Sequence, residues 1–342
     1  MEFRYEKIEK IIVLGGSYLV SEFIKRAHAT LSVEVVVFSA KRHLEEEMYD
    51  MTLRQVLKKA GVRYYESEDI NNDEHLRREV VGNVLGIGMG AAWPFTEETA
   101  RLFKPRYFLD FMSIDLPMYR GGAHHTWRIL HGNNHGSVNL QIIYGGEKMF
   151  HKGEIVKMRA FDFPVGLRKP IDYINYQLGI ELDFLNEFLQ EIKDGKNFEI
   201  TGLDESHSSY YPFLHTATNG FINWAWSGSD IYRFICAFDE PYAGAATTIQ
   251  NIQVVLKDCE KMSGEESYHP FTAGLIVRKD VEAVYVATVG ALLKIAHVVN
   301  EQGVDIKDAL CLGDRFYTSS VVLEKAATFK AVYGASGLVA TN

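Results

Sequence analysis

Apolar runs of strand length alternate with helical patterns over the first third of the chain. Ile8–Leu14 is an apolar run that ends in Gly15-Gly16-Ser17, and Leu19, Phe23 and Ile24 then recur at helical spacing. Further strands are expected at 33–38, 62–65 and 85–89, with a helix at 45–60. Strands that alternate with helices pair in parallel through helical crossovers. The pattern predicts an α/β domain with a doubly wound, mostly parallel sheet.

Beyond this region the patterning changes twice. Strands are expected at 107–111, 138–143 and 155–161 and helices at 121–130 and 169–193, and Ser229 is the expected N-cap of a later helix. From Pro241 onward, short strand patterns at 283–288 and 292–299 predict a small β-barrel-like module. Since 342 residues suit two domains, we predict an α/β domain at 1–195, a linker at 196–216 and a β-barrel-like domain at 217–342.

Charge and hydropathy disfavour several partners. A net charge of −9 opposes nucleic acid, because such binding depends on Lys and Arg neutralising phosphates. No apolar run approaches the ~20 residues of a membrane span, so no membrane is expected. The segment Met1–Lys7 is charged and lacks the shape of a signal peptide, so we expect the cytoplasm.

The glycine turn after the first strand does not indicate dinucleotide binding. Leu19 and Val20 stand where the Gly-x-Gly-x-x-Gly fingerprint needs another glycine. Ligands of doubly wound sheets nevertheless bind at the carboxyl ends of strands. The loops after Met89 and Leu109 are therefore candidates for a site.

One segment combines a strand, a Leu-Pro turn and a helix start. Asp110–Gly122 reads Asp-Phe-Met-Ser-Ile-Asp-Leu-Pro-Met-Tyr-Arg-Gly-Gly. It resembles the signature of the folate-dependent formyltransferases, among them methionyl-tRNA formyltransferase and the sugar N-formyltransferases, in which the strand ends in Asn-x-His. Counting back from Pro117 places the Asn position on Asp110 and the His position on Met112. The frame of the motif is kept, and its two catalytic side chains are changed.

Further blocks resemble the same family. The segment 90–95 (Gly-Ala-Ala-Trp-Pro-Phe) is similar to a loop that helps form the folate pocket, and 210–212 with 220–245 look like the junction to the family's C-terminal barrel. The resemblance implies a formyltransferase-like Rossmann variant followed by an OB-like domain. It implies a cofactor site at Gly90, Trp93, Pro94, Phe95 and Tyr144, and a substrate site at Arg120, Gly121 and Gly122.

The chemistry implied by the resemblance moves a formyl group from 10-formyltetrahydrofolate to an amine. It needs a donor that stabilises an oxyanion and a base that takes a proton from nitrogen. A third residue, an Asp in an Asp-x-Gly loop, orients the family's His. Counting back from Gly153 gives His151 for that residue, whereas counting forward from Gly136 gives Glu147.

Met112 neither titrates nor donates a strong hydrogen bond, so an active enzyme needs a rebuilt catalytic set. Its candidates lie in or beside the motif and are Asp110, Met112, His124, His125, His151 and Glu147. No metal is expected, because Arg128 rather than a ligand stands four residues after His124.

Several residues keep two interpretations. Trp93 and Phe95 can stack on a pterin ring or belong to the core. Arg120 can bind an anion or pair with Asp115. The histidines can be ordinary polar residues of a helix start.

Two functional hypotheses follow. The first is an enzyme that formylates the amine of a small molecule, such as an amino (nucleotide) sugar. The second is a homologue that has lost catalysis and binds a ligand or a partner. A homodimer is left open by the sequence.

Overall fold

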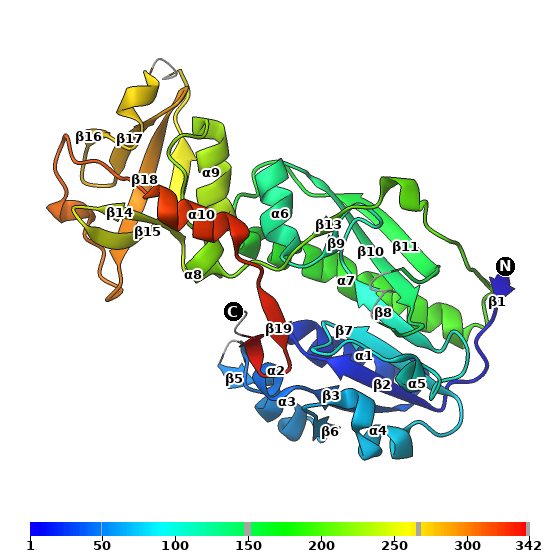
Figure 1. The fold of residues 1–342 in the computed structure, drawn as a ribbon. Helices are drawn as coiled ribbons and strands as arrows, with labels where there is room; N and C mark the ends of the chain where they lie inside the picture. Colours follow the sequence, from blue (N-terminus) through cyan, green and yellow to red (C-terminus); the bar gives the residue numbers. More distant parts are fainter. Residues whose placement is uncertain (49, 147–151, 265–267, 340–342) are drawn as a thin grey trace.

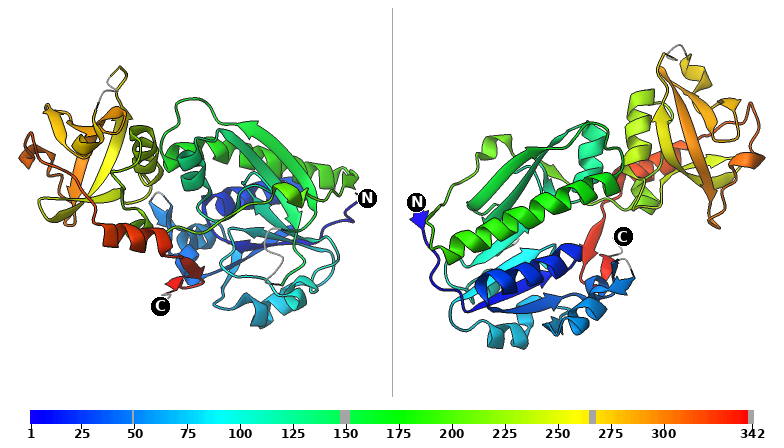
Figure 2. Two further views of the ribbon diagram at one scale, coloured as in Figure 1. Left: turned by 45° about the horizontal axis from the view of Figure 1, so that its top comes forward. Right: turned by 180° about the vertical axis from the view of Figure 1, so that it is seen from behind.

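The computed structural model describes residues 1–48, 50–146, 152–264 and 268–339. Two packed bodies lie side by side, and the chain passes between them more than once (Figures 1 and 2). The helices are α1 (Tyr18–Leu31), α2 (Lys41–Leu44), α3 (Leu53–Lys59), α4 (Glu74–Glu79), α5 (Glu97–Ala100), α6 (His124–His131), α7 (Pro170–Lys193), α8 (Thr216–Asn219), α9 (Gly228–Ala237) and α10 (Ser320–Thr328).

The first body contains a mixed sheet that, within the described ranges, has seven strands. Their order is β11 (Ile155–Asp162), β10 (His135–Ile142), β8 (Phe108–Met112), β7 (Val84–Met89), β2 (Lys10–Gly15), β3 (Glu34–Ser39) and β6 (Arg63–Glu66). The five strands from β8 to β6 are parallel, and β10 and β11 are antiparallel. The predicted α/β class with a mostly parallel sheet is confirmed.

Helices cover both faces of this sheet. The two longest, α1 and α7, lie side by side on one face, as seen from behind in Figure 2. On the other face an Arg77–Glu98 ion pair of 3.0 Å joins α4 to the first turn of α5. The change of face follows from right-handed crossovers, because the chain moves outward from β2 to β6 and then returns to β7 and β8.

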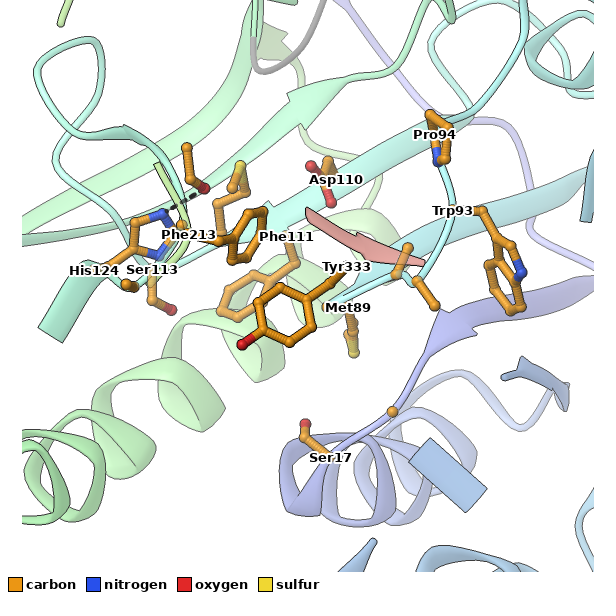
Figure 3. Close-up of a pocket in the computed structure, with 18 of the residues that line it drawn as sticks. Ser17, Met89, Trp93, Pro94, Asp110, Phe111, Ser113, His124, Phe213 and Tyr333 are labelled. Atoms are coloured by element: carbon orange, nitrogen blue, oxygen red, sulfur yellow. Dashed lines mark hydrogen bonds between the residues drawn. The ribbon is translucent and has the colours of Figure 1, made fainter. Parts of the chain in front are cut away.

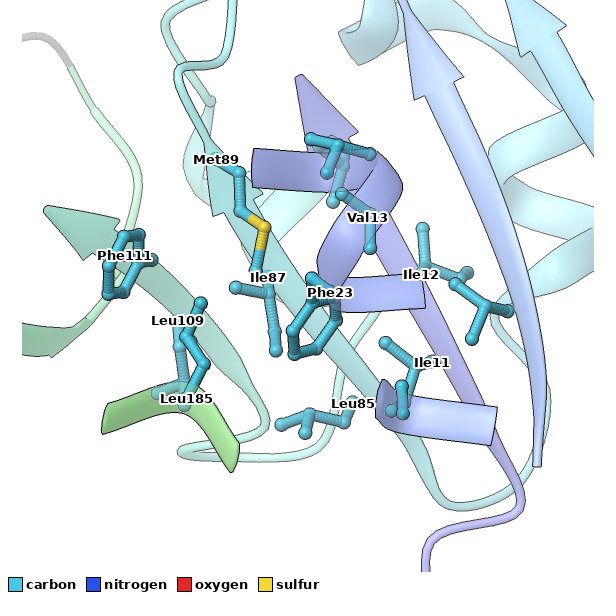
Figure 4. Packing of buried hydrophobic residues seen from close by; sticks show 14 of the residues in the cluster. Ile11, Ile12, Val13, Phe23, Leu85, Ile87, Met89, Leu109, Phe111 and Leu185 are labelled. Atoms are coloured by element: carbon cyan, nitrogen blue, oxygen red, sulfur yellow. The ribbon is translucent and has the colours of Figure 1, made fainter. Parts of the chain in front are cut away.

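The apolar strands predicted from sequence form the core of the first body. Ile11, Ile12, Val13, Leu85 and Ile87 are fully buried, in one cluster with Phe23 of α1 and Leu185 of α7 (Figure 4). A central strand of a parallel sheet is covered on both faces and therefore reads as a continuous apolar run. A second apolar cluster consists of buried residues between positions 222 and 316. Ile129, Phe163 and Tyr173 of the first body also belong to it.

Two predicted helices are shorter than expected. The helix predicted over 45–60 occupies only α3, because Thr52 and Gln55 form a capping box that starts it at Leu53. The residues before it pair as β4 (Glu47–Met48) and β5 (Met51–Thr52). The helix predicted from Gly121 begins instead at α6, because 120–121 forms strand β9 beside β13 (Tyr210–Tyr211).

The second body holds an antiparallel sheet, five-stranded over the residues described. Its order is β14 (Ala245–Ile249), β15 (Ile252–Lys261), β18 (Ala291–Asn300), β17 (Val284–Thr288) and β16 (Ile276–Lys279). The edge strands β14 and β16 do not pair with each other, so the expected OB-like barrel is not confirmed. Single bridges from Arg315 to Leu275 and from Tyr317 to Thr248 reach toward the two edges.

The chain returns to the first body near its end. After α10, the hairpin of β19 (Val332–Gly334) and β20 (Gly337–Val339) lies beside α2 (Figure 1). Ala335 packs against the core of the first body. The expected linker carries β13 and β12 (Phe198–Glu199), which pairs with β1 (Glu2–Phe3). The domain limits at 195 and 217 stay a prediction.

The N-cap of α9 provides a test of local structure. Ser227, not the predicted Ser229, accepts a hydrogen bond from the backbone N–H of Asp230. Ser227→Ala is expected to lower the free energy of unfolding by about 1 kcal/mol. Ser229→Ala should change it by less than about 0.5 kcal/mol. Urea unfolding of both variants measures the difference, and equal losses would contradict the assignment.

Candidate functional site

A cavity of about 730 Å³ opens at the carboxyl ends of the parallel strands. It lies over β2 and β7, where the strand order reverses, which is the usual ligand position in such sheets. Gly16 and Ser17 line it after β2, and Gly90 lines it after β7. Its volume is in the range that holds cofactor-sized ligands. Figure 3 shows Asp110, His124 and Tyr333 around this space.

Asp110 occupies the part of β8 that faces the cavity. Its backbone pairs with Gly88 of β7 and Gln141 of β10. Gly88 leaves room for the carboxyl group, because a Cβ there would lie 2.9 Å from Oδ1 of Asp110. Asp110 keeps partial exposure, yet desolvation raises the pKa of its carboxyl group to about 7. The group therefore titrates near neutral pH.

Met112 and Ser113 follow on the same strand and its exit. Met112 lines the cavity and packs against Ile114 and Leu116. The hydroxyl of Ser113 donates a hydrogen bond to Glu181 of α7. Glu181 also lines the cavity, and burial raises the pKa of its carboxyl group. The second carboxyl group was missed from sequence because it lies 68 residues away on a helix that reads as plainly amphipathic.

The two adjacent histidines point to different surroundings. His124 lines the cavity, and its Nε2 lies 3.0 Å from the carbonyl oxygen of Gly121 (Figure 3). Because a carbonyl only accepts, Nε2 carries the hydrogen, and Nδ1 of the neutral ring is an acceptor. Burial lowers the pKa of His124 to about 4 and that of His125 to about 3. His125 is not among the described residues that line the cavity.

Arg120, Gly121 and Gly122 separate in the structure. The glycines line the cavity. Arg120 is buried and makes two 2.8 Å hydrogen bonds to the carboxylate of Glu205. Of the two interpretations of Arg120, the pairing with Asp115 is not the one found, because the pairing of β9 with β13 brings the segment that carries Glu205 next to Arg120. Substrate binding by these three residues stays a prediction.

All five residues predicted to bind the cofactor line the cavity. They are Gly90, Trp93, Pro94, Phe95 and Tyr144. Trp93 is 7% exposed and donates its indole N–H to the carbonyl oxygen of Glu68 at 3.0 Å. Phe95 packs edge-to-face on Phe108 at 4.9 Å. Both aromatic residues thus belong to the wall of the core as well as to the wall of the cavity.

Two predicted catalytic residues cannot be placed, and three residues that were not predicted line the cavity. Glu147 and His151 lie outside the described residues. Arg42, His43 and Tyr333 line the cavity without having been predicted. Within the described ranges, no cluster of His, Cys, Asp or Glu could hold a metal ion. No helix there is long and apolar enough to cross a membrane.

Comparison with known proteins places this architecture. Residues 215–310 match the model of the formyl transferase C-terminal domain. The N-formyltransferase from Helicobacter canadensis, solved with folinic acid and dTDP-3-aminofucose, superposes with a TM-score of 0.64 at 16% identity, covering 84% of this chain and 99% of that one. The chain has the formyltransferase fold. Both the domain match and the superposition support the formyltransferase family.

Two further structures extend the likeness within this fold. WlaRD, a sugar 3N-formyltransferase solved with dTDP and 5-N-formyl-THF, has a TM-score of 0.62 at 15% identity, covering 85% of this chain and 98% of that one. HypX from Aquifex aeolicus, solved with tetrahydrofolic acid, has a TM-score of 0.52 at 14% identity, covering 86% of this chain and 45% of that one. The formyltransferase fold therefore extends over most of the present chain.

Proposed function

We propose that this chain transfers a formyl group from 10-formyltetrahydrofolate to the amine of a small molecule, such as an amino nucleotide sugar. The observation that carries the proposal is the position of Asp110 on the cavity wall in β8, where burial raises the pKa of its carboxyl group to about 7. The folate donor and the nucleotide-sugar acceptor are supported by the named structures of the same fold. All three were solved with folates, and two of them also with dTDP or a dTDP-sugar.

The residues present fit a folate as formyl donor. The loop after β7 and the loop after β10 line the cavity with Gly90, Gly145 and Gly146, which have no side chain to fill it. Pro94 and Phe95 add apolar wall on the same side. When bound, the donor supplies an electrophilic formyl carbon.

The family motif assigns two tasks to its Asn and His, which are to stabilise an oxyanion and to take a proton. Asp110 alone can perform both. As a carboxylate it takes a proton from the acceptor nitrogen, so that an N–H bond breaks and an O–H bond forms on Asp110. As a neutral acid it can then donate a hydrogen bond to an oxygen on which negative charge develops, as protonated carboxyl groups in apolar sites do. Asp110 would return to the carboxylate by giving its proton to the donor nitrogen as the bond from that nitrogen to the formyl carbon breaks. A pKa of about 7 keeps both forms populated near neutral pH.

A binding protein without catalysis is the second candidate. Met112 favours it, because this side chain packs into an apolar cluster at the position where the family places its His. In that case the cavity would still take up a ligand, but no group transfer would follow.

Two measurements separate the candidates. Calorimetric titration with folinic acid is expected to show saturable binding, whereas p-aminobenzoylglutamate, which lacks the pterin ring, should bind much more weakly. Absence of folinic acid binding would rule out both the folate as donor and the proposed formyl transfer activity. If folinic acid binds, a panel of dTDP-linked amino sugars is then assayed with 10-formyltetrahydrofolate. Transfer to one of them supports the enzyme, and transfer to none supports the binding protein.

A further inference from the structure

Two amide side chains of β10 stand directly opposite the two changed positions of the motif. Gln141 pairs with Asp110, and Asn139 pairs with Met112. Directly opposed residues of antiparallel strands share one face of the sheet, and their Cβ atoms lie about 4.5–5.5 Å apart. The chain thus carries amide groups beside the positions where the family's motif has its Asn and His, although neither amide belongs to the motif itself.

The two amides differ in their access to the cavity. Gln141 lines it, whereas Asn139 is not among the described residues that do so. The side chain of Asn139 is fully buried, and its Nδ2 donates a hydrogen bond to the carbonyl oxygen of Ile114 at 3.1 Å. Asn139 therefore holds the start of the Leu-Pro turn in place, and Gln141 is the amide that can meet a ligand.

The carbonyl oxygen of Gly153 fixes the orientation of the Gln141 amide. It accepts a hydrogen bond of 2.6 Å from Nε2, and since a carbonyl only accepts, this end of the amide is the nitrogen. A side chain at position 153 would disturb this contact, because its Cβ would lie 1.8 Å from the carbonyl oxygen of Ile142 and 3.1 Å from Cγ of Gln141. Gln141 is also 2% exposed. A buried amide held in this way needs little reorganisation to meet a developing charge.

The formyl transfer described above needs a hydrogen-bond donor that does not titrate. When the amine attacks, a bond from its nitrogen to the formyl carbon forms, and one electron pair of the C=O bond moves onto the oxygen. Asp110 has to be a carboxylate at that moment, because it then takes the proton from the attacking nitrogen. A carboxylate repels the new charge, and Asp110 becomes a donor only after the proton has arrived. An amide N–H can stabilise the charge while the bond forms.

We propose that Gln141 is a further catalytic residue, whose Nε2 donates a hydrogen bond to the formyl oxygen as negative charge develops on it. The proposal rests on the function proposed above. Nε2 carries two hydrogens, so the bond to Gly153 is kept while the second hydrogen is donated. Gln141 stabilises the charge, and Asp110 transfers the proton. When the bond from the formyl carbon to the donor nitrogen breaks, the electron pair on the oxygen restores the C=O bond and the charge disappears.

Gln141→Met tests this role, because Met is similar in length and has no N–H to donate. The value of kcat for formyl transfer to the acceptor found in the panel is expected to fall about 10²- to 10³-fold. The remaining rate should still rise with pH as in the native chain, since Asp110 is unchanged. Calorimetric affinity for folinic acid should not change, because the donor acts on a charge that exists only during the reaction. Gln141→Ala serves if the Met variant does not fold.

Gln177→Met is the matched control. Gln177 is 4% exposed and also donates from Nε2, to a carboxylate oxygen of Glu181 at 2.7 Å. It is not among the described residues that line the cavity. The control therefore removes the same kind of buried amide at a distance from the reacting atoms, and its kcat should equal that of the native chain.

The outcomes separate this role from the proposed function. A fall in kcat for Gln141→Met with the pH dependence kept, folinic acid binding unchanged and a native rate in Gln177→Met supports Gln141 as the donor. A near-native kcat in Gln141→Met overturns the role of Gln141 and leaves the proposed formyl transfer in place. An equal loss in Gln177→Met overturns it as well, because the effect then comes from the fold. Absence of transfer by the native chain to every acceptor in the panel overturns both proposals.

Discussion

The value of kcat/KM for formyl transfer is expected to rise with pH through about 7 and to fall about 10²- to 10⁴-fold when Asp110 is replaced by Asn. The direction follows from the proposed role, because Asp110 must be ionised to take a proton, and the ionised fraction grows as the pH passes its raised pKa. Asn cannot accept that proton. The variant should therefore lose both the rate and the transition near pH 7. Activity is measured with the acceptor found in the panel.

Two controls make the Asp110 result specific. Asp162→Asn removes a carboxyl group from the exposed end of β11 and should leave the rate and the profile unchanged. A direct titration of carboxyl groups by NMR should show a transition near pH 7 in the native chain that is missing in Asp110→Asn. An Asp110→Asn variant with a near-native rate, or with the transition still present, would rule out Asp110 as the base.

A second large effect is expected on stability. Gly121 has φ of +114°, and a Cβ there would lie 1.8 Å from the carbonyl oxygen of Tyr211. Gly121→Ala therefore combines backbone strain of about 1–3 kcal/mol with a displacement that costs about 1–3 kcal/mol more. It should separate β9 from β13 and lower the free energy of unfolding by the sum of both. Urea unfolding gives this difference.

Gly166 offers a matched comparison for Gly121. Its φ of +105° is similar, but a Cβ there would meet nothing within 4 Å. Gly166→Ala should thus show the strain alone. If the two variants lose equal stability, the contact with Tyr211 does not contribute to the loss in the free energy of unfolding. If Gly121→Ala fails to fold while Gly166→Ala folds, the steric interpretation is supported.

The centre of the main sheet could be predicted because its strands there are apolar throughout. Ile11–Leu14 and Val84–Met89 are buried on both faces, and a run of this kind has few alternatives. Thr96 caps α5, and its pattern of Thr followed by two acidic residues is a local signal of a helix start. The helix predicted over 45–60 was wrong in its first half, because the capping box at Thr52 starts the helix only at Leu53.

The site could be predicted only where its residues share one segment. The position of Asp110 at the end of a strand indicated a ligand site, and the structure places that residue in the cavity. Arg42, Glu181 and Tyr333 come from three distant elements, and each looks ordinary in its own segment. Their assembly depends on strand order and on the return of the chain, which local patterns do not encode. The partner of Arg120 was missed for the same reason.

The return of the terminal hairpin to the first body has a mechanical consequence. The two bodies are joined by the segment before α8 and again by the segment after α10, so the chain forms a double tether between them (Figure 1). A single tether would allow one body to swing about a hinge. The two tethers lie side by side, joined by a backbone bridge between Phe213 and Ala331 and by the contacts of Tyr333 with Phe213 and Leu214, and a large separation of the bodies would have to disturb these contacts. Ligands are thus expected to enter through the mouth of a preformed cavity, without a large separation of the two bodies.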